Sequence, residues 1–192
     1  LHCRHVARYL DSGTVHGTSF LCMELVEGTP LDDYLTIHAP ALDAKLGIVT
    51  KVARAVAELH DAGVVHRDLK PRHIIVDAQG QPHIVDLGLS AARGDDWATL
   101  IRKTQTRLGR IIGTLKYMSP EQAWGGLYPT DHRADVWALG VMLFEIVTNG
   151  DLPYSQEPLE GMSPADALLY RIQHETPARP QIADPRYASA LT

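Results

Sequence analysis

The sequence has few cysteines, no excess of positive charge and no long hydrophobic run, and each absence excludes a class of protein. Two cysteines, Cys3 and Cys22, are too few for a disulfide framework and favour a reducing compartment. The net charge of −5 lacks the basic excess that nucleic-acid-binding proteins need, so we expect no nucleic-acid partner. The longest apolar run, residues 136–144, is too short to span a bilayer and predicts a buried core helix.

The composition is that of a globular domain. Hydrophobic residues make up 45% and charged residues 21% of the 192 residues, which argues against disorder. A chain of this length predicts one domain with one sizeable core. It begins with Leu1 rather than methionine, inside what reads as a structured stretch, so we expect a piece of a longer protein.

Hydrophobic patterning predicts an α+β fold dominated by helices. A hairpin is predicted over residues 6–26, because the apolar run 20–26 is bounded by glycines and a proline. Apolar residues at spacings of three and four predict a long amphipathic helix from Ala44, closed by Gly63. The other predicted elements are helices at 31–37, 134–147 and 165–174 and short strands at 64–65, 74–76 and 83–85.

Four short motifs carry the chemistry, and their order is informative. Residues 66–73 (HRDLKPRH) resemble the catalytic loop of protein kinases, and residues 86–88 (DLG) resemble their metal-binding Asp-Phe-Gly. Residues 113–121 resemble the end of the activation segment, and residues 135–140 resemble the start of the helix that supports the catalytic loop. The chain is therefore identified as a member of the eukaryotic-like serine/threonine protein kinases, and Gln122-Ala123 is typical of their bacterial members.

This resemblance implies roles in phosphoryl transfer for four residues. Asp68 would accept the proton of the attacking hydroxyl, and Lys70 would meet the γ-phosphate as charge builds there. Asp86 would bind Mg²⁺ between the phosphates of ATP. His73 stands where the family has a metal-binding asparagine, and a ring nitrogen is a poor Mg²⁺ ligand. The alternatives without a catalytic role are a solvated loop aspartate for Asp68, a surface lysine for Lys70 and a turn-capping aspartate for Asp86.

The resemblance also implies an adenine pocket and a set of supporting residues. The backbone of Glu24 and Val26 would bind adenine at the hinge, and Ile75 and Val85 would line the floor of the pocket. Asp135 would accept backbone N–H groups of the catalytic loop; the alternative is an ordinary carboxylate at a helix start. The remaining structural residues are His66 and Leu87, which would pack between the lobes, and Glu121, which would pair with a buried arginine.

Substrate class and regulation follow from the same resemblance. Lys70 and Thr114 resemble serine/threonine rather than tyrosine kinases, and Thr114 would contact Asp68. Arg67, directly before Asp68, is typical of kinases that activation-loop phosphorylation switches on. A phosphate on Thr104 or Thr106 would pair with Arg67; the alternative is a basic solvated loop without a regulatory role.

We therefore expect residues 1–26 to form the end of the small lobe and the hinge, and residues 27–192 to form the large lobe. The expected activity of the parent protein is phosphorylation of protein serine and threonine with ATP and Mg²⁺. The chain by itself lacks a Gly-rich phosphate loop and strand lysine, so we expect it to be inactive alone.

Two alternative functions stay open at this point. One is a pseudokinase that binds partners, which His73 favours, and the other is a small-molecule kinase of the same fold. The expected partners are ATP and protein substrates, with a homodimer for autophosphorylation as a further assembly that the family allows. The expected location is the cytoplasm, with any membrane anchor of the parent outside these residues.

Overall fold

The chain forms two compact units, each described here by itself. The structure, a computed structural model, describes residues 3–16, 18–87, 113, 115–125, 127–182 and 184–188. The first unit comprises Leu1–His66 and Pro71–Arg93, and the second comprises Arg67–Lys70 and Gly94–Thr192. The predicted lobe boundary between residues 26 and 27 divides the chain differently and stays a prediction.

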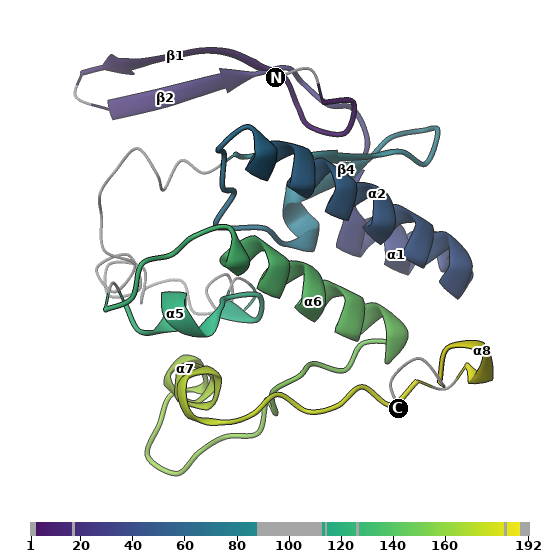
Figure 1. The fold of residues 1–192 in the computed structure, drawn as a ribbon, viewed down its shortest axis with the longest axis vertical. Coiled ribbons are helices and arrows are strands. Elements are labelled where there is room, and N and C mark those ends of the chain that lie inside the picture. The colour runs from purple at the N-terminus through teal and green to yellow at the C-terminus, as the bar shows by residue number, and fades with distance from the viewer. Residues whose placement is uncertain are drawn as a thin grey trace. The chain divides into compact units, whose positions relative to one another are not determined.

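Two helices and a three-stranded antiparallel sheet form the centre of the first unit (Figure 1). The sheet order is β3 (Thr29–Pro30), β4 (Ile74–Val76) and β5 (Pro82–Ile84). The helices are α1 (Leu31–His38) and α2 (Leu42–Asp61), and a short 3₁₀ helix, η1 (Pro71–His73), leads into β4.

The long helix α2 confirms the predicted amphipathic pattern. Its buried residues recur every three or four positions, as Val49, Val52, Val56 and Leu59 show. Gly63 ends the helix with a φ of 75°, a left-handed conformation that glycine adopts without strain. The strand predicted at 64–65 is wrong, because the Val64 N–H donates to the Leu59 carbonyl (2.9 Å) and so helps to close α2.

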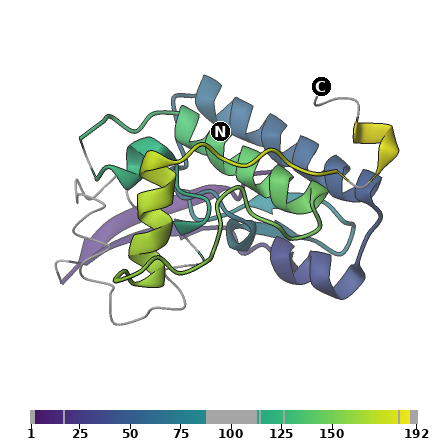
Figure 2. The same cartoon turned by 90° about the horizontal axis from the view of Figure 1, so that it is seen from below.

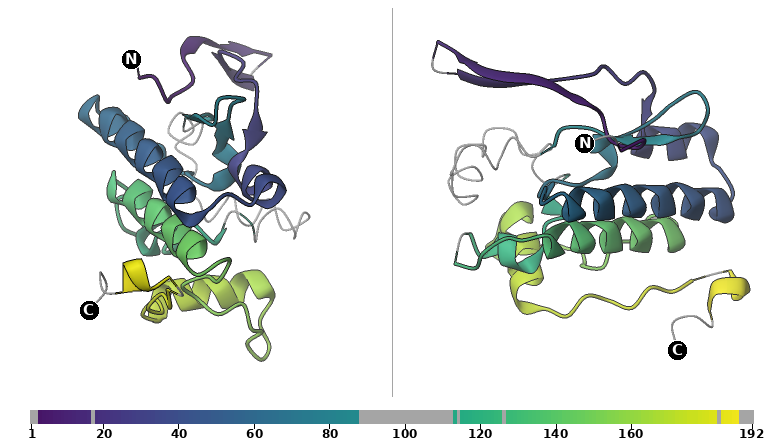
Figure 3. Two further views of the ribbon diagram at one scale, coloured as in Figure 1. Left: turned by 90° about the vertical axis from the view of Figure 1, so that its right-hand side faces the viewer. Right: turned by 45° about the horizontal axis from the view of Figure 1, so that its top comes forward.

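The predicted N-terminal hairpin is confirmed. Strands β1 (Tyr9–Val15) and β2 (Thr18–Met23) pair antiparallel, with Tyr9 opposite Met23 and Val15 opposite Thr18. The hairpin projects from the rest of the first unit as a two-stranded ribbon (Figure 3). The residues before it run beside β5, where the Ala7 N–H donates to the Ile84 carbonyl at 2.8 Å.

Helices dominate the described part of the second unit. They are α5 (Pro120–Ala123), α6 (Arg133–Val147), α7 (Pro164–His174) and α8 (Pro185–Ala188), which confirms the helices predicted at 134–147 and 165–174. Helix α5 lies against α7 (Figure 2), and the core between them includes Leu115, Met118, Leu168 and Ile172. No helix in the described ranges is long and apolar enough to cross a membrane.

Candidate active site

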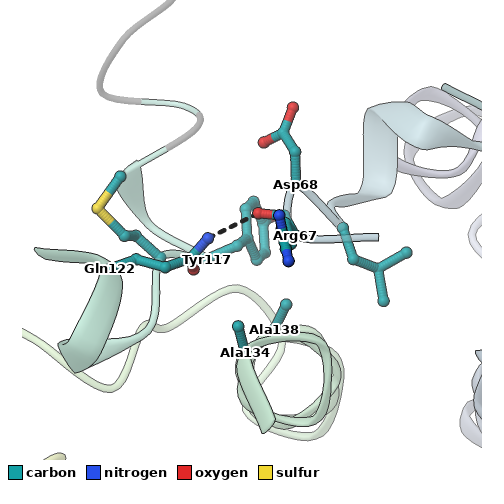
Figure 4. Close-up of a pocket in the computed structure, with 8 residues that line it drawn as sticks. Arg67, Asp68, Tyr117, Gln122, Ala134 and Ala138 are labelled. Carbon is teal, nitrogen blue, oxygen red and sulfur yellow. Dashed lines mark hydrogen bonds between the residues drawn. The ribbon is translucent and has the colours of Figure 1, made fainter. Parts of the chain in front are cut away.

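The second unit holds the two residues predicted to act on the phosphate. Lys70 Nζ lies 3.0 Å from Asp68 Oδ2, and the two side chains are 16% and 26% exposed. The Asp68 carboxylate points away from Ala134 and Ala138 of α6 (Figure 4). A carboxylate and a cation thus stand side by side at a partly exposed position, where one can accept a proton and the other can neutralise phosphate charge.

The residue before Asp68 has an unusual backbone conformation. Arg67 has a φ of 64°, which for a residue other than glycine costs on the order of 1–3 kcal/mol and needs support from its surroundings. Its N–H donates to Asp135 Oδ1 at 2.7 Å. Asp135 is 1% exposed in the first turn of α6, so this is a buried bond to a carboxylate, the stronger kind of hydrogen bond.

A second support of Arg67 was not foreseen from the sequence. Gln122, on α5, donates from Nε2 to the Arg67 carbonyl at 2.7 Å (Figure 4). In the sequence Gln122 is only typical of bacterial kinases, and nothing in its local sequence points to a partner 55 positions away. The pocket around this contact is lined by both residues, by Asp68 and by small residues of α6.

The first unit holds the two residues predicted to meet the metal. Asp86 has a φ of 59° and a side chain that is 56% exposed, and His73 Nε2 lies 3.8 Å from Asp86 Oδ2. The His73 ring stacks on that of His66, with 5.8 Å between centroids. His66 is fully buried, and its Nε2 lies 3.1 Å from the Val85 carbonyl. A buried histidine therefore orients the ring that faces Asp86.

These donors fit Mg²⁺ in part. Mg²⁺ in phosphoryl-transfer sites is held by one or two carboxylates together with phosphate oxygens and water, and Asp86 can supply such a carboxylate. The His73 nitrogen is a donor that Mg²⁺ accepts reluctantly. Within the described residues no cluster of three His, Cys, Asp or Glu side chains could hold a metal by itself. The donor set therefore suits an ion that arrives with the nucleotide.

The predicted adenine-binding residues all lie in the first unit. Glu24 follows β2, and its N–H donates to the Arg8 carbonyl at 2.9 Å. Ile75 lies in β4 opposite Pro30, and Val85 follows β5, where its N–H donates to the His73 carbonyl at 2.9 Å. Val26, Ile75 and Val85 are each half-buried, which suits contact with a flat apolar ring.

Three predicted site residues, Thr104, Thr106 and Thr114, lie outside the described residues. Leu87 and Glu121 are half-buried; the packing of Leu87 between the lobes and the pairing of Glu121 with a buried arginine stay predictions. Among the described residues, Arg67 Nε is buried without a hydrogen-bond partner.

The chain is similar in sequence to known proteins along most of its length. The family model described as protein kinase domain matches residues 1–185. The serine/threonine-protein kinase PrkC of Bacillus subtilis is 33% identical over 175 residues, 91% of this chain and 25% of that protein. PknH of Mycobacterium tuberculosis H37Rv, also named a serine/threonine-protein kinase, is 35% identical over 179 residues, 93% of this chain and 27% of that protein. The chain thus spans about a quarter of the length of these relatives.

Proposed function

The chain belongs to the protein kinase domain family, and from this we propose that its parent protein transfers the γ-phosphate of ATP to serine and threonine hydroxyls of proteins. The observation that carries the proposal is the Asp68–Lys70 pair, next to an Arg67 backbone held by Asp135. PrkC and PknH are named serine/threonine-protein kinases, which favours protein over small-molecule substrates. We place the reaction in the cytoplasm.

In the proposed reaction, the substrate oxygen attacks the γ-phosphorus while the bond from that phosphorus to the β-phosphate oxygen breaks. Asp68 takes the hydroxyl proton, and Lys70 stabilises the charge on the transferring group. The backbone of Glu24 and Val26 binds adenine, with Ile75 and Val85 against its ring. Asp86 would hold Mg²⁺ together with the phosphates, and the bound ion would supply positive charge beside the leaving ADP.

The experiment that tests the function supplies the full-length protein with ATP labelled on the γ-phosphate. We expect label on serine or threonine of added proteins and of the enzyme itself. Aminoglycosides and choline, offered in parallel, are expected to stay unlabelled. Label on these small molecules alone would identify a small-molecule kinase, and absence of both nucleotide binding and labelling would identify a pseudokinase.

We expect His73→Asn in the full-length protein to lower the Mg²⁺ concentration for half-maximal activity by about threefold to tenfold. The physical reason is that an amide oxygen replaces a ring nitrogen beside Asp86, and Mg²⁺ prefers oxygen ligands. The measurement is the initial rate against Mg²⁺ concentration for both proteins, repeated with Mn²⁺. Because Mn²⁺ accepts imidazole more readily, it should reduce the difference between wild type and His73→Asn in the metal concentration for half-maximal activity.

His83→Asn is the matched control for this titration. His83 makes the same kind of imidazole–carboxylate contact, with 2.9 Å between its Nε2 and Asp77 Oδ2, but at the β4–β5 hairpin. Its Mg²⁺ curve should match that of the wild type. Superimposable curves for wild type and His73→Asn, at full turnover, would refute a metal role for His73.

A further inference from the structure

Gln122 makes a hydrogen bond that the proposed mechanism does not use. It is 4% exposed on the four-residue helix α5, and its Nε2 donates to the Arg67 carbonyl at 2.7 Å (Figure 4). The two residues lie 55 positions apart in the sequence, so only the folded second unit brings them together. A buried amide that reaches the residue next to Asp68 is placed to affect the direction of the Asp68 side chain.

The other end of the Gln122 amide is also held. Its Oε1 accepts from the backbone N–H and from the hydroxyl of Ser119, each at 3.1 Å, and Ser119 is fully buried at the start of α5. Two donors at Oε1 leave Nε2 to face the Arg67 carbonyl. An amide can accept at one atom and donate at the other, whereas a carboxylate only accepts.

The backbone of Arg67 is therefore held on both sides. Its N–H donates to Asp135 and its carbonyl accepts from Gln122, each at 2.7 Å. Because a peptide group is planar, orienting the Arg67 carbonyl also orients the N–H of Asp68 and limits the direction of its Cα–Cβ bond. This matters more where the chain has a left-handed φ of 64°, since such a residue would otherwise relax to another conformation.

We propose that Gln122 is a positioning residue that sets the direction of the Asp68 carboxylate through the Arg67–Asp68 peptide. The inference rests on the proposed function, because it assigns Gln122 to the same reaction. Gln122 acts without touching substrate or nucleotide. It couples its own position on α5 to the catalytic loop through the bond to the Arg67 carbonyl.

The test is Gln122→Glu in the full-length protein. Glutamate has the same length and can still accept from Ser119, but it puts an acceptor against the Arg67 carbonyl. We expect kcat to fall roughly 10- to 30-fold, because small misplacement of a catalytic group costs this much, while KM for ATP changes by less than about twofold.

Gln173→Glu is the matched control. Gln173 Nε2 donates to the Ala123 carbonyl, also at 2.7 Å and also between a side chain and the backbone of the second unit. The same chemical change there should lower kcat by less than about twofold, while the melting temperature changes by about as much as it does in Gln122→Glu. An equal kcat for Gln122→Glu and Gln173→Glu would overturn the proposal.

A second measurement separates positioning from general damage. In an Asp68→Asn background, Gln122→Glu should cause no further loss of the residual turnover, because the group it positions is already disabled. An undiminished loss in that background would overturn the proposal. If Gln122→Glu does not fold, Ser119→Ala removes one bond to Oε1 and should lower kcat by about threefold in wild type but not in Asp68→Asn. No effect of Ser119→Ala on wild-type kcat would then overturn it.

These outcomes also separate this inference from the proposed function. A full-length protein that transfers no phosphate refutes both. The positioning role alone is refuted if the wild type is active, Asp68→Asn disables it, and the kcat of Gln122→Glu equals that of Gln173→Glu.

Discussion

Asp68→Asn in the full-length protein is expected to lower kcat by about 10²- to 10⁴-fold, the usual cost of losing a general base. Asparagine has nearly the same shape, and its amide oxygen can still accept from Lys70, which lies 3.0 Å from the carboxylate in the wild type. The amide does not take up the proton of the substrate hydroxyl. Folding and nucleotide binding should therefore persist while turnover is lost. Steady-state rates measure the turnover, ATP titration measures nucleotide binding, and thermal melting measures folding.

Asp77→Asn provides the control for this change. Asp77 is also an aspartate beside a basic side chain, and the hydrogen bond from His83, followed by the backbone bond from Gln81, holds its pKa below the usual range. It belongs to the β4–β5 hairpin and has no role in the proposed reaction, so kcat should stay within about twofold of wild type. Near-normal turnover in a folded Asp68→Asn protein would show that Asp68 is not the base.

Phosphorylation of Thr104 or Thr106 is expected to raise kcat/KM by about 10²-fold. A phosphate that pairs with Arg67 makes charge-assisted hydrogen bonds worth at least about 1.5 kcal/mol each, and two bonds of that strength shift a loop equilibrium by roughly 10². The threonines lie outside the described residues, so support for the proposal comes from the sequence and from Arg67 Nε, which is buried without a partner among the described residues.

The measurement compares the activity of protein treated with phosphatase before and after incubation with ATP, with mass spectrometry of the loop. Thr104→Ala with Thr106→Ala should remove the activation, and so should Arg67→Met. Arg133→Met is the control, since Arg133 is an exposed arginine of the same unit that pairs with Asp131 at 3.0 Å. If one copy of the protein phosphorylates the loop of another, the rate of activation per enzyme molecule rises with protein concentration. Full activation of the double alanine variant would contradict the proposal.

The sequence determined much of the secondary structure, because helix and strand periodicity is a property of neighbouring residues. The spacing of Val49, Val52, Val56 and Leu59 was enough to predict α2, and the apolar run at 134–147 was enough to predict α6. Prediction was wrong at residues 64–65, where two valines favour a strand. The Val64 N–H closes α2 instead, and that bond depends on how the helix ends rather than on strand preference.

The chemistry of the candidate site was likewise readable from residue types in order: Asp68, Lys70 and Asp86 lie in short motifs whose spacing identifies the family. For the backbone beside Asp68, the family resemblance implied the Asp135 contact, whereas tertiary structure alone decided the Gln122 contact. Arg67 takes a left-handed φ because a carboxylate 68 positions away and an amide 55 positions away bind its N–H and carbonyl. Such bonds depend on the packing of remote elements, which composition, periodicity and local preference do not encode one residue at a time.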